Sequence, residues 1–278
     1  MLLGRVPFSG PFFVCPELGA LMKIATWNVN SIKARRPNAL AWLGDAKPDV
    51  VLFQETKTVN EKFPAMEIED LGYNLALNGQ KTYNGVAILS KQPVEDVVTV
   101  LPGDDGDDHA RYIEAVVGDV RVVSVYVPNG GEVTSDKFQY KLRWFERLRD
   151  HVAELLLFEE PLVVGGDYNV APGPGDVYDP VGLAGTTCFH PDEQVRFRAL
   201  LNLGLTDAYQ VLNPQPHAYS WWDYRGGGWQ KDHGMRIDHL LLSCQAADRL
   251  KGSGIDRKVR GTEKASDHVP VWCDLADP

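Results

Sequence analysis

Short apolar runs that end in polar residues recur along this chain. Residues 23–29 (KIATWNV), 49–56 (DVVLFQET) and 161–169 (PLVVGGDYN) are three examples. Short apolar runs bounded by turn-like residues are typical of buried β-strands. The same pattern predicts further strands in YNLAL (73–77), GVAILS (85–90), YIEAVV (112–117), VRVVSVYV (120–127), YSWWDY (219–224), IDHLLLS (237–243) and VPVWCDL (269–275).

Helical spacing of apolar residues appears in fewer places. One long amphipathic helix is predicted over residues 135–158, where the apolar positions step by three or four. Those positions are Phe138, Leu142, Phe145, Leu148, Val152 and Leu155. A shorter helix is predicted after Pro37, and short helices are predicted in QVRFRALLNLG (194–204) and after Thr206.

The order of these elements predicts an α/β fold with many strands and few helices. Most connections are too short for a parallel crossover, and runs that are apolar on both faces need a cover on both sides. We therefore expect two packed sheets, mostly antiparallel or mixed, with helices outside. No proline- or serine-rich linker divides the chain, so residues 22–278 are predicted to form one domain. Residues 1–21 are interpreted as a loosely ordered extension or a miscalled start.

Composition narrows the class of protein. Hydrophobic residues at 44% and charged residues at 24% are the averages of globular chains, which excludes a disordered or fibrous protein. No apolar run reaches the ~18–20 residues that a membrane span needs. The net charge of −10 argues against a basic coat for indiscriminate nucleic-acid binding. The four cysteines lie far apart, and their spacing fits neither a zinc site nor a disulfide framework. This usage indicates a protein of the reducing cytoplasm.

Candidate chemistry lies where the predicted strands end. Acidic, amide and imidazole side chains stand at these ends, and strand ends on one edge of packed sheets converge. The residues are Asn28, Glu55, Asp167, Asn169, Asp267 and His268. Carboxylate and amide oxygens without cysteine are the ligand set of a hard cation, and Mg²⁺ suits it best because Mg²⁺ keeps waters for substrate phosphates.

Asp238 lies inside an apolar strand, where a carboxylate is costly to bury unless it is paired. An imidazole is a good partner, because a carboxylate fixes the tautomer and raises the pKa of the ring. His268 and the adjacent His239 are both candidates, and the spacing does not choose between them.

Several motifs together resemble one family. They are TWNVNSIKAR (26–35), QETK (54–57), NGVAILS (84–90), YVPNG (126–130), GDYNVAP (166–172), YSWWDYR (219–225), RIDHLLLS (236–243) and SDHVPV (266–271). In this order they resemble the exonuclease III family of apurinic/apyrimidinic endonucleases, within the endonuclease/exonuclease/phosphatase superfamily. The resemblance covers residues 22 to about 275 and implies a four-layer α/β sandwich of two packed sheets flanked by helices.

The resemblance also implies roles for single residues. Glu55 resembles the principal metal-binding carboxylate, with Asn28 and Asp267 lining the same site. Asp167 resembles the residue that orients or deprotonates the attacking water, and Asn169 would bind the scissile phosphate; both are counted among the metal-site residues. Tyr126 and His268 would contact the phosphate, with Asp238 orienting the imidazole.

The implied activity is that of a Mg²⁺-dependent DNA-repair nuclease in which Mn²⁺ substitutes for Mg²⁺. It would cut the backbone 5′ to abasic sites in base excision repair. On double-stranded DNA it would also act as a 3′–5′ exonuclease and clean blocked 3′ ends. The implied protein is a cytoplasmic, DNA-associated monomer. Predicted DNA-contact residues are Lys57, Arg111, Asn129, Trp221, Arg225 and His268, whereas Trp222 is predicted to pack in the core.

Two other functions remain open at this point. A phosphoesterase acting on sphingomyelin or inositol polyphosphates would share the GD-N and SDH elements, although YSWWDYR and QETK argue against it. A catalytically inactive relative would bind DNA without cutting it, although Glu55, Asp167 and His268 are all present. The acidic run 104–108 (DDGDD) is interpreted as a solvated turn, because it lacks the ligand spacing of a calcium loop.

Overall fold

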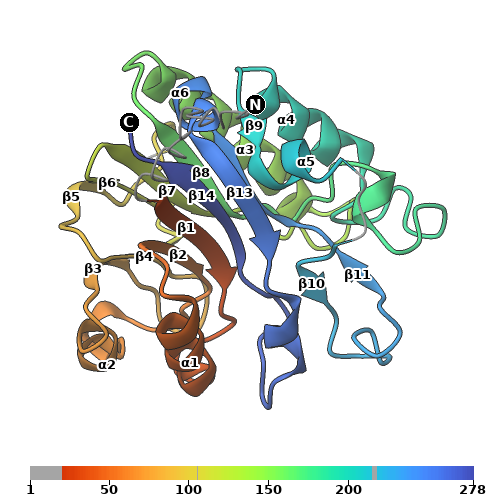
Figure 1. Cartoon of the computed structure of the whole chain (residues 1–278). Helices are drawn as coiled ribbons and strands as arrows, with labels where there is room; N and C mark the ends of the chain where they lie inside the picture. Colours follow the sequence, from red (N-terminus) through yellow and green to blue (C-terminus); the bar gives the residue numbers. More distant parts are fainter. Residues whose placement is uncertain (1–20, 105, 215–217) are drawn as a thin grey trace, which may run out of the picture.

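A computed structural model describes residues 21–104, 106–214 and 218–278. Two six-stranded sheets pack face to face, and helices cover both outer faces (Figure 1). The predicted α/β sandwich is confirmed. The prediction of an N-terminal extension falls outside the described residues except for Leu21, which begins β1 and pairs with Ala276.

The first sheet has the order β13-β14-β1-β2-β4-β3. Its strands are β13 (Leu250–Ile255), β14 (Val271–Ala276), β1 (Leu21–Asn28), β2 (Val50–Gln54), β4 (Val86–Ser90) and β3 (Asn74–Asn78). The second sheet has the order β5-β6-β7-β8-β12-β9. Its strands are β5 (Glu95–Val98), β6 (Tyr112–Val117), β7 (Val120–Tyr126), β8 (Leu162–Asp167), β12 (Asp238–Leu242) and β9 (Thr206–Asp207). A small hairpin pairs β10 (Trp221–Trp222) with β11 (Gly234–Met235).

The helices are α1 (Arg36–Ala46), α2 (Ala65–Glu69), α3 (Asp136–Leu156), α4 (Pro191–Leu201), α5 (Ala208–Leu212) and α6 (Cys244–Asp248). Short 3₁₀ turns are η1 (Asn60–Lys62), η2 (Pro174–Asp176) and η3 (Arg257–Gly261). The predicted long helix is confirmed as α3. Its start has a local cause, because Ser135 accepts a hydrogen bond from the Phe138 N–H and so caps the first turn.

Each sheet is mixed, and its parallel pair has a helix in the connection. β1 pairs parallel with β2 across α1, and β7 pairs parallel with β8 across α3, while the other named strand pairs are antiparallel. A parallel pair needs a crossover of a dozen or more residues, usually a helix. Among the described residues, only these two connections between consecutive, neighbouring strands of a sheet carry a helix of two turns or more.

Alternation along the strands explains the four layers. In β1, Ile24 packs between the two sheets while Ala25 and Trp27 pack beneath α1. In β7, Val122 points into the inter-sheet core and Val123 points toward α3. Successive strand residues face opposite sides, so a strand buried on both faces has an unbroken apolar run.

Two glycines before Asp167 allow close packing at the site end of β8. A Cβ on Gly166 would lie 1.9 Å from the carbonyl oxygen of Val125. A Cβ on Gly165 would lie 2.6 Å from side-chain carbons of Leu240 and Leu52, which belong to different sheets. Glycine at both positions therefore brings the strand that carries Asp167 close to its neighbours.

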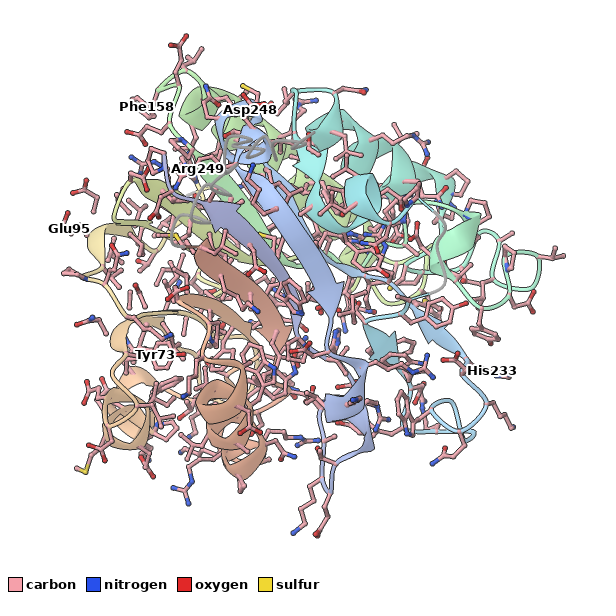
Figure 2. The ribbon with its side chains drawn as sticks, viewed as in Figure 1. Tyr73, Glu95, Phe158, His233, Asp248 and Arg249 are labelled. Carbon is pink, nitrogen blue, oxygen red and sulfur yellow. The ribbon has the colours of Figure 1, made fainter. Side chains whose placement is uncertain are left out.

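Two strands at the sheet edges, β5 and β13, lack the apolar pattern of the other strands. All four residues of β5 are exposed, and Glu95 lies at the outer edge of the molecule (Figure 2). β13 (LKGSGI) has two glycines and only partial burial. Neither strand has a fully buried face that would impose alternation, so the apolar pattern does not predict them. Only Trp221 and Trp222 of the predicted strand 219–224 are in a strand. Within the described ranges, no helix combines the length and apolar character that crossing a bilayer requires.

Candidate active site

The polar residues at the strand ends converge in one pocket, as the sequence predicts. In the second sheet, Asp167 at the end of β8 lies opposite Tyr126 of β7 and Asp238 of β12. In the first sheet, Asn28 ends β1, and Glu55 directly follows β2. A pocket of about 430 Å³ is lined by Glu55, Tyr126, Asn129, Asp167, Asn169, Thr187, Cys188, Trp221, Asp223, Arg225, Met235, Ile237, Asp267 and His268.

Backbone hydrogen bonds explain why three sequence motifs come together around Glu55. The Ser31 N–H donates to the Glu55 carbonyl at 2.7 Å, so the loop after β1 lies against the loop after β2. The Lys57 N–H donates to the Asn84 carbonyl at 2.9 Å, which adds the segment before β4. Glu55 has φ 52°, a left-handed conformation that costs free energy in a non-glycine residue and is held by these neighbours.

Asn28 connects the two carboxylates at the base of the pocket. Its Nδ2 donates to Glu55 Oε1 at 2.8 Å and to Asp167 Oδ2 at 2.9 Å. Glu55, Asp167 and His268 each offer a ligand atom, and these atoms lie within 4.8 Å of one another. Two carboxylates held this close are suited to a divalent cation, because their repulsion is relieved by the positive charge.

The pKa values of the two carboxyls move in opposite directions. Burial raises the pKa of Asp167 to about 7; His268 opposes this rise, and Asp238 adds to it. For Glu55, burial is the largest cause and acts to raise the pKa, but the Lys57 ammonium, the Asn28 hydrogen bond and the charge of His268 together hold the pKa below its usual range. Lys57 Nζ lies 2.5 Å from Glu55 Oε2. Asp167 is therefore the carboxyl of the pair whose proton affinity suits a base near neutral pH.

His268 is the partner of Asp238. Its Nδ1 lies 2.9 Å from Asp238 Oδ2, and its Nε2 lies 3.7 Å from Asp167 Oδ2. Burial by itself lowers the pKa of an imidazole, but the charges of Asp238 and then Asp167 raise the pKa of His268 to about 10. The ring is therefore a charged donor beside the pocket at neutral pH. The alternative partner, His239, is wrong because its Nδ1 lies 3.2 Å from Asp207 Oδ2.

Tyr126 offers a protonated hydroxyl to the same pocket. Burial, together with the nearby charges of Glu55 and Asp167, raises the pKa of Tyr126 well above its ordinary range. The Arg111 guanidinium lies over the Tyr126 ring, 4.6 Å from its centroid, and donates to the Tyr126 carbonyl at 3.2 Å. Arg111 thus supports Tyr126 from outside the pocket lining.

Asn169 is held on two sides. Its Nδ2 donates to the Val127 carbonyl at 3.0 Å, and its Oδ1 accepts from Asn129 Nδ2 at 2.9 Å. Its backbone is left-handed, with φ 51°, and its N–H donates to Asp167 Oδ1. The amide is thereby fixed next to Asp167 at the pocket wall.

Lys141 holds these loops together, although none of the motifs predicts this role. The side chain is fully buried, forms an ion pair with Glu193, and donates from Nζ to the carbonyls of Asn169 at 2.7 Å and Asn129 at 3.1 Å. A signal was present, because Lys141 stands three residues after Phe138 and four before Phe145, on the buried face of α3.

Arg236 is a second buried cation that sequence analysis did not single out. Its guanidinium lies 2.7 Å from both Asp176 and Asp207, and it stands two residues before Asp238. A buried charge in an apolar setting must be paired, and here two carboxylates pair it. Arg236 therefore anchors the start of β12 without reaching the pocket.

Of the remaining predicted residues, Asp267, Arg225 and Trp221 line the pocket, and Trp222 does not. Asp267 accepts from Asn30 at 2.8 Å and from Trp221 Nε1 at 3.1 Å, and it lies outside the three-residue cluster that meets metal-ligand distances. Arg225 is exposed and pairs with Asp223. Trp222 is fully buried, as predicted, while Trp221 lines the pocket.

Comparisons with known proteins agree with this geometry. The Endonuclease/Exonuclease/phosphatase family matches residues 25–268. The chain is 34% identical to exodeoxyribonuclease III of Haemophilus influenzae, over 91% of this chain and 100% of that one. A Neisseria 3′ phosphatase solved with a product DNA hairpin shares 41% identity at a TM-score of 0.90, over 92% of this chain and 100% of that one.

A second solved structure, an AP endonuclease from Archaeoglobus fulgidus, shares 37% identity at a TM-score of 0.88. It covers 92% of this chain and 100% of its own. The chain therefore belongs to the endonuclease/exonuclease/phosphatase family, in its exonuclease III and AP endonuclease group of DNA-repair nucleases, and is an enzyme that hydrolyses phosphodiester bonds.

Proposed function

We propose that residues 22–278 form a Mg²⁺-dependent nuclease domain that hydrolyses the phosphodiester 5′ to abasic sites in double-stranded DNA. The same site would remove nucleotides and blocking groups from 3′ ends. The observation that carries the proposal is the cluster of Glu55, Asp167 and His268, with ligand atoms within 4.8 Å of one another in a pocket that also holds Tyr126 and Asn169.

The donor set supports a hard cation. Glu55 and Asp167 supply carboxylate oxygens, and neighbouring Asn28 and Asp267 add amide and carboxylate oxygens, which suit Mg²⁺ and Mn²⁺. When bound, the ion would supply charge neutralisation at the phosphate oxygens.

The remaining roles belong to side chains. Asp167, with its pKa raised to about 7, would orient the attacking water and accept its proton. His268, oriented by Asp238, would donate a charged hydrogen bond to the phosphate as negative charge develops. Tyr126 and Asn169 would donate neutral hydrogen bonds to the same group.

The pocket rim supports double-stranded DNA as the substrate. Trp221, Arg225 and Asn129 line the pocket, and Lys57 and Arg111 each contact one of its lining residues. One relative of known structure is a 3′ phosphatase with a DNA hairpin, and another is an AP endonuclease. The monomeric state and the cytoplasmic, DNA-associated location stay predictions.

The test is incision of a duplex that carries one tetrahydrofuran abasic analogue. With Mg²⁺ or Mn²⁺ we expect a cut 5′ to the analogue, and with EDTA we expect none. Parallel duplexes with a 3′-phosphate and with an undamaged recessed 3′ end measure the end-processing activities. Wild-type protein that leaves all three duplexes intact with either metal would refute the proposal.

Tight binding to the abasic duplex without any cut would instead support an inactive relative. Hydrolysis of an inositol polyphosphate with no action on DNA would support the small-molecule phosphoesterase. A ranking of the three DNA substrates by initial rate would define which repair reaction dominates.

A further inference from the structure

Tyr224 lies at the rim of the pocket between two arginines from distant segments. Its chain neighbours Asp223 and Arg225 both line the pocket, and Tyr224 itself is 48% exposed. The guanidinium of Arg35 lies 5.9 Å from the Tyr224 ring centroid, and that of Arg260 lies 4.9 Å from it. Arg35 Nη2 also donates to the Tyr224 hydroxyl at 2.8 Å. Arg35, Tyr224 and Arg260 are called the Arg–Tyr cluster below.

Neither arginine of the cluster is neutralised within the part of the chain that the structure describes. No carboxylate oxygen there lies within 4.0 Å of a guanidinium nitrogen of Arg35 or Arg260. The Nε of each is buried and lacks a hydrogen-bond partner among the described residues. Two unpaired guanidiniums beside one ring are unusual in a chain of net charge −10, because like charges repel and carboxylates are abundant.

Cation–π contacts with aromatic rings hold Arg260 in place. Its guanidinium lies 5.8 Å from the Trp229 ring centroid and donates to the Trp222 carbonyl at 3.4 Å. The neighbouring Arg257 lies over the rings of both Trp222 and Trp229, and it pairs with Asp232 at 2.9 Å. Stacking therefore fixes both arginines, whereas only Arg257 has its charge satisfied inside the protein.

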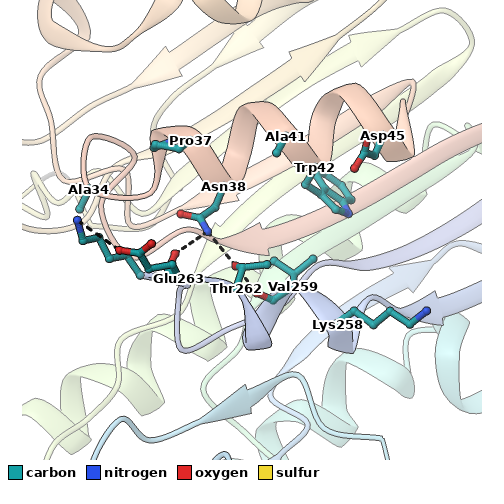
Figure 3. A pocket seen from close by; sticks show the side chains of 11 residues that line it. Ala34, Pro37, Asn38, Ala41, Trp42, Asp45, Lys258, Val259, Thr262 and Glu263 are labelled. Atoms are coloured by element: carbon teal, nitrogen blue, oxygen red, sulfur yellow. Dashed lines mark hydrogen bonds and ion pairs between the residues drawn. The ribbon is translucent and has the colours of Figure 1, made fainter.

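The two segments that carry the arginines are tied together. Asn38 of α1 donates to the Thr262 hydroxyl at 2.9 Å and to the Glu263 carbonyl at 3.1 Å (Figure 3). These bonds set the distance between the start of α1 and the end of η3. A groove of about 490 Å³ lies between the same segments, but its lining mixes lysines with Asp45 and Glu263, so its charge does not select an anion.

Hydrogen bonds connect the Arg–Tyr cluster to the backbone segment that carries Asp267 and His268. The Tyr224 hydroxyl donates to the Ala265 carbonyl at 2.9 Å, two residues before Asp267. The Trp222 N–H donates to the Asp267 carbonyl at 2.9 Å. An anion held by the cluster would therefore lie beside the segment that carries Asp267 and His268.

We propose that Arg35 and Arg260, with Tyr224 between them, bind a phosphodiester of the bound duplex that is separate from the scissile one. The inference rests on the proposed action on DNA. Phosphate oxygens accept the free N–H groups of both guanidiniums, and a fixed guanidinium loses little entropy on binding. Such a contact positions the duplex and carries no sequence information.

The test compares two double variants with equal net charge. Arg35→Gln with Arg260→Gln removes the unpaired arginines. Arg149→Gln with Arg196→Gln removes two arginines of α3 and α4 that already have carboxylate partners, Asp150 and Glu146. Binding to an undamaged duplex of about 20 base pairs is measured by fluorescence anisotropy in EDTA, at several salt concentrations between about 50 and 200 mM.

We expect the first variant to bind roughly tenfold more weakly and to lower the slope of log affinity against log salt by about one, because one phosphate contact contributes about 0.9 to the slope. The α3–α4 variant should retain the wild-type slope. Arg35→Lys with Arg260→Lys should restore most of the slope, since lysine keeps the charge, whereas a merely structural role would not be rescued in this way.

A wild-type salt slope in the Arg35/Arg260 glutamine variant would overturn this proposal, even if the wild-type enzyme cuts DNA. Conversely, wild-type protein that binds this duplex but leaves the abasic, 3′-phosphate and recessed duplexes uncut with Mg²⁺ or Mn²⁺ would refute the proposed function, and the salt slope would still decide the role of the cluster. Wild-type protein that does not bind the undamaged duplex would overturn the role of the cluster, whatever it cuts. Circular dichroism of each variant confirms that it is folded.

Discussion

Two neighbouring residues of β12 take part in two carboxylate–imidazole pairs with different surroundings. Asp238 faces the pocket and lies 2.9 Å from Nδ1 of His268. His239 lies on the opposite face of the strand, where its Nδ1 meets Asp207 at 3.2 Å and Arg236 at 3.0 Å. The same chemical groups thus stand back to back across one strand, because successive strand residues face opposite sides.

The second ring nitrogen distinguishes the two pairs. Nε2 of His239 lies 3.0 Å from the Val170 carbonyl, so every polar atom of that pair is used inside the protein. Nε2 of His268 lies 3.7 Å from Asp167, beyond hydrogen-bond distance, and the ring lines the pocket. We call Asp207–His239 the closed pair and Asp238–His268 the open pair. The closed pair can only stabilise the fold, whereas the open pair can contact a ligand. A carboxylate–imidazole motif is therefore informative about catalysis only when one nitrogen remains available.

The largest effect is expected for Asp167→Asn, next to the open pair. The substitution keeps the shape of the side chain and removes the base, so the incision rate should fall by about three to four orders of magnitude. Single-turnover cleavage of the abasic duplex measures the rate, and urea unfolding should show no loss of stability. Asp192→Asn, at an exposed carboxylate of α4, is the control. Near-normal turnover in Asp167→Asn would remove the base role assigned to this carboxyl.

Arg236→Met should produce the largest effect on stability. It leaves Asp176 and Asp207 buried without their cation, which typically costs about 3–5 kcal/mol. The free energy of unfolding in urea measures the loss, while the folded fraction should keep its cleavage rate within about tenfold. Arg249→Met, at a partly exposed pair with Asp119, should cost less than about 1 kcal/mol. Equal losses in both variants would contradict the role of the closed pair.

Asp238→Asn and Asp207→Asn compare the two pairs directly. In Asp238→Asn the imidazole loses the charge that raises its pKa, so cleavage per folded molecule should fall about 100-fold. In Asp207→Asn the neutral amide no longer pairs Arg236, so stability should fall while cleavage per folded molecule is retained. The two variants are measured side by side by single-turnover rate and by urea unfolding. If both lose rate and stability in the same proportion, the distinction between open and closed pairs fails.

The smallest effect is a dependence of stability on pH in the metal-free protein. Asp167 has its pKa raised from 3.8 to about 7, and His268 has its pKa raised from 6.5 to about 10. Both groups hold protons more tightly in the folded state, so stability falls as pH rises through about 4 to 7 for Asp167 and about 6.5 to 10 for His268.

Differential scanning fluorimetry in EDTA should therefore show a thermal midpoint that drops by a few degrees as pH rises across this window. Added Mg²⁺ should raise the midpoint most at the high-pH end, where Asp167 is ionised. Asp167→Asn should flatten the lower part of the pH dependence. A midpoint that rises with pH in the wild type, with no change in the Asn variant, would contradict the proton affinities given to the pair.

The site residues that stand at the ends of strands could be predicted well from the sequence. Asn28, Glu55, Asp167 and Asp267 were predicted from the polar residues that stop apolar runs, and they do converge on the pocket base and rim. The buried cations that hold the surrounding loops and strands in place could not be predicted as readily. Lys141 and Arg236 act through partners that lie 52 and 60 residues away in the chain, and sequence spacing does not indicate such contacts.

The sequence by itself determined the alternation of apolar runs, the long helix α3 and the chemistry of the strand ends, because these depend on periodicity and residue type within a few positions. Only the tertiary structure decided that His268 and not His239 meets Asp238, and that Arg35 and Arg260 share one tyrosine. Those outcomes depend on which strands and loops become neighbours. That choice follows from burying two sheets and their helices together, so no local stretch of the chain contains it.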